Sequence, residues 1–318
     1  MADPTIEKIV ASVKGRPVEV RRVERQPLRF STAFPTEIVS ITLEDGETVS
    51  LFVKQLGQEQ SDHPDKQQRD RELQVYGRLF KGGLHPVPRY YGNEWNAQTQ
   101  RWDLYFEYID GWKLKHCDMN TWFLAAEKLG ALHGYFMNRG EVLQSAEFLL
   151  QLDSRYFLTW AERAIQSLVG FPLRVQENLR AIAARYDVIA SLLASQPPTL
   201  VHNDLAPKNV VVDRGVKPDR ICFVDWELAG RGCGLLDLVY LKYKLDPETG
   251  ARMVGHYCSA LASTFGSAPG GRELHILLAA CELHRRIYRI ARREAWNITE
   301  KDTIQSVAEA QQWFDSTL

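Results

Sequence analysis

The 318-residue sequence predicts an α+β fold with two lobes, a small N-terminal lobe built on an antiparallel sheet and a larger, mainly helical C-terminal lobe. Strand-like runs dominate roughly the first hundred residues, whereas amphipathic helical patterns dominate after residue 118. A chain of this length can also bury a sizeable core in two lobes. We therefore expect domain boundaries at 1–107 for the first lobe, 108–112 for a hinge and 113–318 for the second lobe.

The N-terminal lobe is predicted from β-branched and aromatic runs that turn signals separate. Four strand-like runs lie at 18–30, 36–56, 89–95 and 101–109. The pair Asp45-Gly46 interrupts the second run and is typical of a tight hairpin turn. A charged helix is expected at 63–80, where Leu73 and Tyr76 stand at helical spacing.

The C-terminal lobe is predicted to be helical on both sides of one compact β section. An amphipathic helix is expected at 120–136, and Pro197-Pro198 ends the helical stretch that precedes the β section. The three short strands of that section are expected at 200–204, 209–213 and 220–226. From about residue 235 the chain is expected to be helical again.

Composition and charge exclude several classes of function. The net charge is −1, so neither a nucleic-acid partner nor an anionic membrane surface is expected. The five cysteines are odd in number and form no CxxC pair, which favours reduced thiols over disulfides or a zinc site. No stretch has the roughly 18 apolar residues of a spanning helix, and the N-terminal segment does not resemble a secretory signal. We therefore expect a cytoplasmic enzyme or binding protein.

The stretch TLVHNDLAPKNVVV, residues 199–212, carries the strongest functional signal. His202, Asp204 and Asn209 have the spacing of a kinase catalytic loop, and Asp225 follows Asn209 by 16 residues. Phosphoryl transfer depends on positioning and charge neutralisation more than on covalent help from the protein. Asp204 can orient an attacking hydroxyl and accept its proton, while Asn209 and Asp225 offer the hard oxygen ligands that magnesium prefers. We expect His202 to support the loop by hydrogen bonding.

Two upstream residues stand in the order that this chemistry requires. Lys54 ends the strand-like run VSLFVK, where a phosphate-binding lysine is expected. Glu72 lies in the predicted helix at 63–80 and is placed to pair with Lys54. Alone, Lys54 is typical of a solvated strand edge and Glu72 of a helix surface, and a single HxDxxxxN match arises by chance. Together with the downstream motif they predict a kinase-like active site.

These segments resemble the aminoglycoside phosphotransferase and choline kinase-like family, whose members are relatives of the protein kinases. The resemblance rests on the segments LFVKQL, RELQVYGRL, FEYIDGWKL, LVHNDLAPKNVVV and FVDWELAGRGCGLLDLVYL, in this order. It implies a bilobal protein-kinase-like fold. Only 11 residues separate Asp225 from Asp237, which leaves no room for the long activation segment of a protein kinase and disfavours a peptide substrate.

The resemblance also implies roles for particular residues. Asp204 resembles the catalytic base of the family, and Asn209 and Asp225 resemble its magnesium ligands. Lys54 resembles the contact to the α- and β-phosphates of the nucleotide, with Glu72 as its ion-pair partner.

Two further positions complete the implied site. Backbone groups near Glu107 to Ile109 resemble the connector that binds the adenine ring. Asp237 resembles a structural carboxylate that braces the catalytic loop, and a helix cap stays open as the alternative.

The sequence departs from the family pattern at two places. The segment at 26–37, expected to cover the nucleotide, has no glycine, so either the hydroxyls of Ser31 and Thr32 contact phosphate or the segment stands further away. Lys208 stands where family members commonly have glycine or another small residue. It could reach the γ-phosphate and spread transition-state charge, or it could be a solvated loop lysine.

The acceptor site is expected on the helical half, where the charge pattern is informative. Residues 141–195 contain six acidic residues and five arginines, and residues 270–318 contain seven acidic and seven basic residues. These segments lack the acidic surplus that a polycationic aminoglycoside calls for. Arg285, Arg289 and Trp296 share a stripe that is either a solvated basic face or a pocket for an anionic or neutral polar acceptor.

The sequence therefore predicts an enzyme that transfers the γ-phosphate of ATP or GTP, with Mg²⁺, to a hydroxyl of a small molecule. An antibiotic or related natural product is the first expectation for the acceptor. A metabolic kinase of a sugar, nucleoside or amino alcohol is one alternative, and a nucleotide-binding pseudokinase-like module is another. The expected partner is a small hydroxylated substrate, with no nucleic acid and no membrane, and the oligomeric state is left open.

Overall fold

The computed structural model describes residues 4–28, 34–57, 63–81 and 85–317, and the chain divides into two compact units. The first unit contains Met1–Cys117 and Lys208–Leu228, and the second contains Asp118–Pro207 and Ala229–Leu318. The predicted α+β class, with an antiparallel sheet in one unit and mainly helices in the other, is confirmed. The division differs from the predicted domain boundaries, because Lys208–Leu228 groups with the N-terminal residues.

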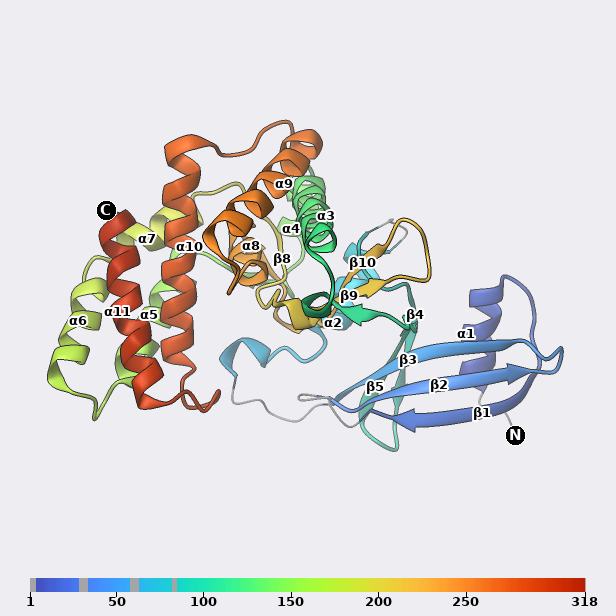
Figure 1. Cartoon of the computed structure of the whole chain (residues 1–318). Helices are drawn as coiled ribbons and strands as arrows, with labels where there is room; N and C mark the ends of the chain where they lie inside the picture. The colour runs from blue at the N-terminus through green and yellow to red at the C-terminus, as the bar shows by residue number, and fades with distance from the viewer. Residues whose placement is uncertain (1–3, 29–33, 58–62, 82–84, 318) are drawn as a thin grey trace. The chain divides into compact units, whose positions relative to one another are not determined.

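A five-stranded antiparallel sheet forms the centre of the first unit, in the order β1-β2-β3-β5-β4 (Figure 1). Its strands are β1 (Val20–Pro27), β2 (Thr36–Leu43), β3 (Thr48–Gly57), β4 (Tyr90–Asn96) and β5 (Arg101–Glu107). All four predicted runs form strands, and the hairpin between β2 and β3 turns at Gly46, which has a φ of +85°. Helix α1 (Pro4–Lys14), which the sequence patterns did not predict, buries Ile6 and Val10 in one core with Val39 and Ile41.

The helix predicted at 63–80 is shorter and less regular than expected. Its elements are the 3-10 turn η1 (Pro64–Lys66), the helix α2 (Arg71–Gln74) and the π-helical turn η2 (Val75–Leu79). Pro64 has no backbone N–H to donate, so it starts a turn instead of standing inside a helix. The π-helical turn places Tyr76 in the core, where its ring centroid lies 4.7 Å from that of Phe106 on β5.

A smaller antiparallel sheet, in the order β10-β9-β6, belongs to the same unit. Its strands are β6 (Trp112–Lys113), β9 (Val210–Asp213) and β10 (Arg220–Phe223). The pairing of β6 with β9 explains why Lys208–Leu228 groups with the N-terminal residues. A Cβ atom at Gly111 would come within 2.6 Å of the Val212 carbonyl oxygen, so the end of the predicted hinge needs glycine to approach β9.

The second unit is mainly helical (Figure 1). Its helices are α3 (Met119–Met137), α4 (Gly140–Gln144), α5 (Ser154–Ser167), α6 (Leu173–Ala183), α7 (Tyr186–Ala194), α8 (Leu235–Leu241), α9 (Pro247–Phe265), α10 (Gly271–Ala291) and α11 (Glu300–Thr317). A three-stranded sheet in the order β7-β11-β8 consists of β7 (Leu150–Gln151), β8 (Thr199–Val201) and β11 (Gly230–Gly232). The helix predicted at 120–136 is confirmed as α3. In the described part of the chain, no helix combines the length and the apolar character that crossing a membrane requires.

Helices α3 and α9 approach each other closely because α3 presents two glycines. A Cβ atom at Gly130 would lie 2.3 Å from the carbonyl oxygen of Tyr257, and one at Gly134 would lie 2.8 Å from the Cβ atom of Thr264. This approach matters for the functional site, because α9 carries Tyr257 and α3 carries His133, and both side chains are completely buried.

Replacing Gly130 by Ala should lower the free energy of unfolding by about 1–3 kcal/mol, because the new Cβ would force α3 and α9 apart although Ala is the better helix former. The matched control is Gly255→Ala on α9, where a Cβ atom has no neighbour within 4 Å. That variant should gain about 1 kcal/mol. Urea unfolding measures both free energies, and equal effects would contradict a requirement for the close approach.

Candidate active site

The first half of the candidate site is an ion-pair cluster in the N-terminal unit. Lys54 lies on β3 and pairs with Thr36 of β2 and Leu104 of β5, so its backbone is fixed inside the sheet. Its Nζ atom lies 2.5 Å from Glu72 Oε2 and 2.7 Å from Asp225 Oδ1. Three residues predicted from separate parts of the sequence are therefore in direct contact.

The charge of Lys54 depends on its neighbours, because only 7% of the residue is exposed. Burial alone would lower its pKa, but the carboxylates of Asp225 and Glu72 outweigh that effect and raise the pKa above its ordinary value. The ammonium group therefore keeps its proton at neutral pH. The ring of Phe34, with its centroid 5.5 Å from Nζ, adds a favourable cation–π contact.

Helix α2 is anchored to the 3-10 turn η5 (Trp226–Leu228), which directly follows Asp225. Glu72 Oε1 accepts a hydrogen bond from the backbone N–H of Trp226 at 3.3 Å. The neighbouring Arg71 is buried and donates from Nη1 to the carbonyl oxygen of residue 227 at 2.7 Å. The helix that carries Glu72 therefore cannot shift without breaking bonds to the segment that carries Asp225.

Sequence reasoning missed three of these anchoring residues, namely Lys66, Arg71 and Glu227. Lys66 forms an ion pair with the carboxylate of Glu227. The sequence offered one indication of Arg71 and Glu227, namely that each lies close to a predicted site residue. Arg71 precedes Glu72, and Glu227 follows Asp225 by two residues. Charged residues beside a functional residue are equally typical of a solvated surface, so contacts between such distant segments could not be inferred from the pattern.

Asn209 and Asp225 are brought together by the hairpin of β9 and β10. The backbone N–H of Val224 donates to the carbonyl oxygen of Asn209 at 2.9 Å, so the two candidate metal ligands start from neighbouring backbone positions. Asp225 has a φ of +74°, a left-handed conformation that is uncommon outside glycine and that recurs at functional sites. Its side chain is 37% exposed, whereas that of Lys54 is 9% exposed.

The donor set of this hairpin fits a magnesium ion. Asn209 offers a neutral amide oxygen and Asp225 a carboxylate, and magnesium commonly takes one or two such protein ligands together with phosphates and water. Glu227 Oε2 is a buried carboxylate oxygen that has no hydrogen-bond partner among the described residues. In the same described ranges, no three His, Cys, Asp or Glu side chains gather into a metal cluster.

The second half of the candidate site is the loop after β8 in the helical unit. Asp237 on α8 is completely buried and accepts the backbone N–H groups of His202 at 2.7 Å and Asn203 at 2.8 Å. His202 Nδ1 in turn accepts the backbone N–H of Asp204 at 3.3 Å. Asn203 has a φ of +64° and donates from its side-chain amide to the hydroxyl oxygen of Tyr156 at 3.0 Å. These bonds hold the backbone that presents the partly exposed Asp204.

The predicted adenine connector follows directly from β5. The Glu107 carboxylate accepts from Arg220 Nη2 at 2.8 Å and from the backbone N–H of Arg89 at 3.2 Å, which fixes the end of the strand. The backbone N–H of Gly111 donates to the carbonyl oxygen of Ile109 at 2.9 Å. Binding of a nucleotide base by this segment stays a prediction.

Three predicted phosphate contacts also stay predictions. Ser31 and Thr32 lie outside the described residues. Lys208 is exposed in the 3-10 turn η4 (Pro207–Asn209), directly before the candidate metal ligand Asn209.

The basic stripe predicted for the C-terminal helices differs from a solvated face. Arg285 is only 5% exposed, and its Nε and Nη2 atoms each lie 3.0 Å from Glu282 Oε2. Its charge is therefore matched inside the unit. Because α10 ends at Ala291, Trp296 lies in a turn beyond the helix and is 45% exposed, while Arg289 is partly buried on the helix. Acceptor contacts by Arg285, Arg289 and Trp296 stay a prediction.

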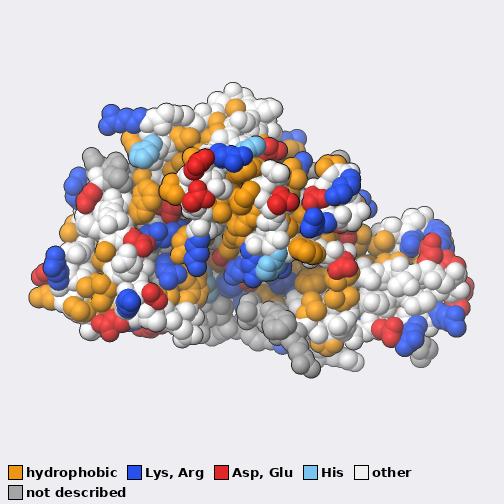
Figure 2. Space-filling view, in the orientation of Figure 1, with side chains coloured by type: hydrophobic (Ala, Val, Ile, Leu, Met, Phe, Trp, Pro, Cys, Tyr) orange, Lys and Arg blue, Asp and Glu red, His pale blue; other side chains and the backbone are white. Residues whose placement is uncertain are grey.

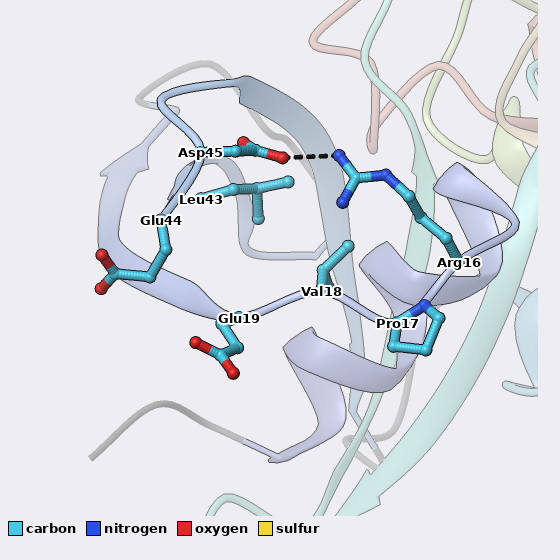
Figure 3. Close-up of a pocket in the computed structure, with 7 residues that line it drawn as sticks. All are labelled: Arg16, Pro17, Val18, Glu19, Leu43, Glu44 and Asp45. Atoms are coloured by element: carbon cyan, nitrogen blue, oxygen red, sulfur yellow. Dashed lines mark hydrogen bonds and ion pairs between the residues drawn. The ribbon is translucent and has the colours of Figure 1, made fainter.

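A cavity of about 300 Å³ lies in the N-terminal unit away from these residues (Figure 3). It is lined by residues 16–19 and 43–45, and Arg16 Nη2 reaches across it to Asp45 Oδ2 at 2.5 Å. The cavity adjoins the turn that precedes β3. Lys54 lies six residues after the start of β3, which is roughly 20 Å along the strand at about 3.3 Å per residue. No predicted site residue lines this cavity, so it contributes nothing to the candidate site.

Comparison with known families decides what kind of protein this is. A model of the phosphotransferase enzyme family matches residues 41–275, a span that includes both halves of the candidate site. The chain belongs to this family. The resemblance noted in the sequence is thereby confirmed, and the phosphotransferase is a small-molecule kinase with a protein-kinase-like fold.

Solved structures similar to the phosphotransferase cover nearly the whole chain. A choline kinase from Streptococcus pneumoniae is 16% identical, with a TM-score of 0.57 over 98% of this chain and 99% of that one. A putative aminoglycoside phosphotransferase from Ralstonia eutropha JMP134 is 12% identical, with a TM-score of 0.64 over 99% and 98%. A macrolide 2′-phosphotransferase from Brachybacterium faecium is 15% identical, with a TM-score of 0.56 over 97% and 98%. At such identities the likeness shows the fold alone. A search of curated proteins found no match.

Arg71→Met should lower the free energy of unfolding of the phosphotransferase by about 2–4 kcal/mol, because it removes a buried charged donor from the carbonyl oxygens of residues 65 and 227. Lys81→Met, at an exposed position directly after the same helical segment, is the control and should change stability by less than about 0.5 kcal/mol. Chemical denaturation followed by tryptophan fluorescence measures both. Similar midpoint shifts in the two variants would argue against the anchoring of α2 by Arg71.

Proposed function

We propose that this phosphotransferase moves the γ-phosphate of ATP or GTP to a hydroxyl group of a small molecule, with magnesium as the metal. The observation that supports the proposal best is the contact of Lys54 with both Glu72 and Asp225. One carboxylate comes from α2, and the other comes from the hairpin that also carries Asn209. In kinase-like folds a lysine held in this way contacts the phosphates, and its carboxylate partner fixes its direction.

The charged groups of the N-terminal unit then divide the work of binding the nucleotide. Glu72 keeps Lys54 in place while Lys54 donates hydrogen bonds to the α- and β-phosphates. Asn209 and Asp225 would hold the metal, which supplies neutralisation of phosphate charge when bound. Backbone groups of residues 107–109 would bind the base.

Asp204 acts on the acceptor. Its carboxylate accepts a hydrogen bond from the acceptor hydroxyl and takes the proton as the hydroxyl oxygen bonds to the γ-phosphorus. The bond between the γ-phosphorus and the bridging oxygen breaks, and the nucleoside diphosphate leaves. Asp237 and His202 keep the loop in place for this step, because they bind three consecutive backbone N–H groups, at residues 202, 203 and 204.

For the acceptor we propose an antibiotic or a related natural product. Structural neighbours include phosphotransferases named for aminoglycosides and macrolides. The balanced charge of residues 141–195 and 270–318 supports a neutral or weakly cationic compound. Arg285 is already paired with Glu282, which weakens the case for an anionic acceptor.

A metabolic kinase of an amino alcohol is the second candidate. Structural neighbours include proteins named as choline kinase and aminopropanol kinase. Tyr156 favours this candidate, because its hydroxyl contacts Asn203 directly before Asp204. Aromatic rings of this kind bind ammonium groups by cation–π contact.

Asp204→Asn should lower turnover by about 10²–10⁴-fold, because the variant cannot accept the hydroxyl proton. ATP with magnesium should still raise the melting temperature of the variant, since the nucleotide residues are unchanged. ADP release in the presence of aminoglycosides, macrolides, choline, amino alcohols, sugars and nucleosides identifies the acceptor class. Nucleotide-dependent stabilisation without turnover of any acceptor would support a pseudokinase-like module, and turnover independent of Asp204 would exclude the proposed base.

Lys208→Ala should lower kcat by more than about tenfold and leave the KM for ATP nearly unchanged, because a cation acting on γ-phosphate charge contributes mainly in the transition state. Lys217→Ala is the control, since Lys217 lies in the turn between β9 and β10 with 80% of its side chain exposed. It should alter neither constant. Steady-state kinetics with varied ATP measures both variants, and an unchanged kcat at position 208 would identify a solvated loop lysine.

A further inference from the structure

A chain of buried polar contacts in the helical unit ends at the catalytic loop. The hydroxyl oxygen of Tyr257 on α9 lies 2.8 Å from His133 Nδ1 on α3. His133 Nε2 lies 3.4 Å from Asp237 Oδ2. Asp237 in turn accepts the two backbone N–H groups that precede Asp204. Tyr257, His133 and Asp237 are all completely buried.

The buried tyrosine and the carboxylate determine which groups in these contacts carry the hydrogen atoms. Burial raises the pKa of Tyr257 well above its ordinary value, so the hydroxyl stays protonated and can donate a hydrogen bond to His133 Nδ1. In a neutral imidazole one nitrogen accepts and the other donates, so the ring proton of His133 then lies on Nε2. The opposite tautomer would turn the bare lone pair of Nε2 toward a carboxylate oxygen.

We propose that Tyr257 and His133 are positioning residues for the catalytic loop. Tyr257 fixes the tautomer of His133, and the Nε2–H group of His133 attracts and orients the Asp237 carboxylate that holds the loop backbone. The kinetic consequence of this arrangement rests on the role proposed above for Asp204. The structural consequence, a loop held in one conformation, does not depend on that role.

Packing keeps the His133 ring in this orientation. A Cβ atom at Gly234 would lie 2.5 Å from His133 Nδ1, so the glycine admits the ring and leaves it little room. The Thr199 hydroxyl donates to the His133 carbonyl oxygen at 2.8 Å, which ties α3 to the strand that leads into the loop. The Nε2 atom lies 3.4 Å from Asp237 Oδ2 and forms no hydrogen bond with any described residue, so the attraction to the carboxylate is electrostatic. The N–H group is therefore best satisfied when it faces the carboxylate.

A second buried tyrosine–histidine pair in the same unit provides a matched control. The hydroxyl oxygen of Tyr186 lies 2.9 Å from His284 Nδ1, and both side chains are buried. His284 lies among the rings of Tyr156, Phe157 and Tyr288 and forms no ion pair with a carboxylate of the described residues, and burial lowers its pKa to about 3. Loss of the Tyr186 hydroxyl therefore removes an equivalent buried hydrogen bond without altering the contacts of Asp237.

The test compares Tyr257→Phe with Tyr186→Phe in the full chain. Without the Tyr257 hydroxyl, His133 can take either tautomer, so we expect kcat to fall roughly 5- to 20-fold. The KM for ATP should stay unchanged, because the nucleotide contacts proposed above do not include this pair. Tyr186→Phe should lower thermal stability to a similar extent and leave kcat unchanged. Hydrogen exchange of residues 199–206, measured without nucleotide or acceptor, should accelerate in Tyr257→Phe and not in Tyr186→Phe.

Replacement of His133 supplies a second arm. The amide nitrogen of Gln at position 133 can donate from near the position of Nε2, whereas Leu cannot donate at all. His133→Gln should keep most of the kcat and of the exchange protection, and His133→Leu should lose both. Equal kcat and exchange in the two tyrosine variants, or in the Gln and Leu variants, would overturn the proposal. Absence of kinase activity in the wild-type protein would count against the proposed function. Hydrogen exchange does not require turnover, so the exchange comparison would still test the positioning role of Tyr257 and His133.

Discussion

The contact of the Lys54 ammonium group with Glu72 and Asp225 is the interaction on which the N-terminal half of the site depends. It joins the large sheet, helix α2 and the β9–β10 hairpin across a separation of 171 residues between Lys54 and Asp225. A buried ammonium group that loses a carboxylate partner is strongly destabilising. The three elements are therefore constrained to the one packing arrangement that brings the charges together. Within the hairpin, the carbonyl oxygen of Asn209 accepts the N–H of Val224, the residue directly before Asp225.

In the helical half of the site, a buried charge also depends on its partners, which here are backbone N–H groups. Asp237 is a buried carboxylate whose oxygens accept N–H groups of the loop, so its burial is tolerated only while the loop stays closed around it. Each half also contains one left-handed residue beside a functional group, Asn203 in the loop and Asp225 after β10. Such conformations persist where surrounding bonds compensate their cost. The bonds from Asn203 to Tyr156 and from Lys54 to Asp225 provide that compensation.

Patterns between neighbouring residues predicted the strands, the hairpin and the order of the charged motif, because alternation and turn chemistry are local. The helix at 63–80 was predicted too long, because residues 64–66 form a separate 3-10 turn and α2 begins only at Arg71. The bond that fixes this start, from Arg71 to the carbonyl oxygen of residue 227, joins segments far apart in the sequence. The same limit applies to the site. Lys54 was recognisable from its motif, whereas Arg71 and His133 act through partners that lie far away in the sequence.

The charge of the N-terminal cluster argues that a cation belongs to its function. Its ion-paired groups include Lys54, Lys66, Glu72, Asp225 and Glu227, and the buried guanidinium group of Arg71 lies in the same cluster. The positive charges of the cluster are therefore matched by carboxylates, whose repulsion of a polyphosphate is strong where water is excluded. A divalent cation held by Asn209 and Asp225 would supply the additional positive charge that a polyphosphate needs. Nucleotide and metal are therefore expected to bind together, and the exposed Lys208 beside Asn209 would add the next positive charge.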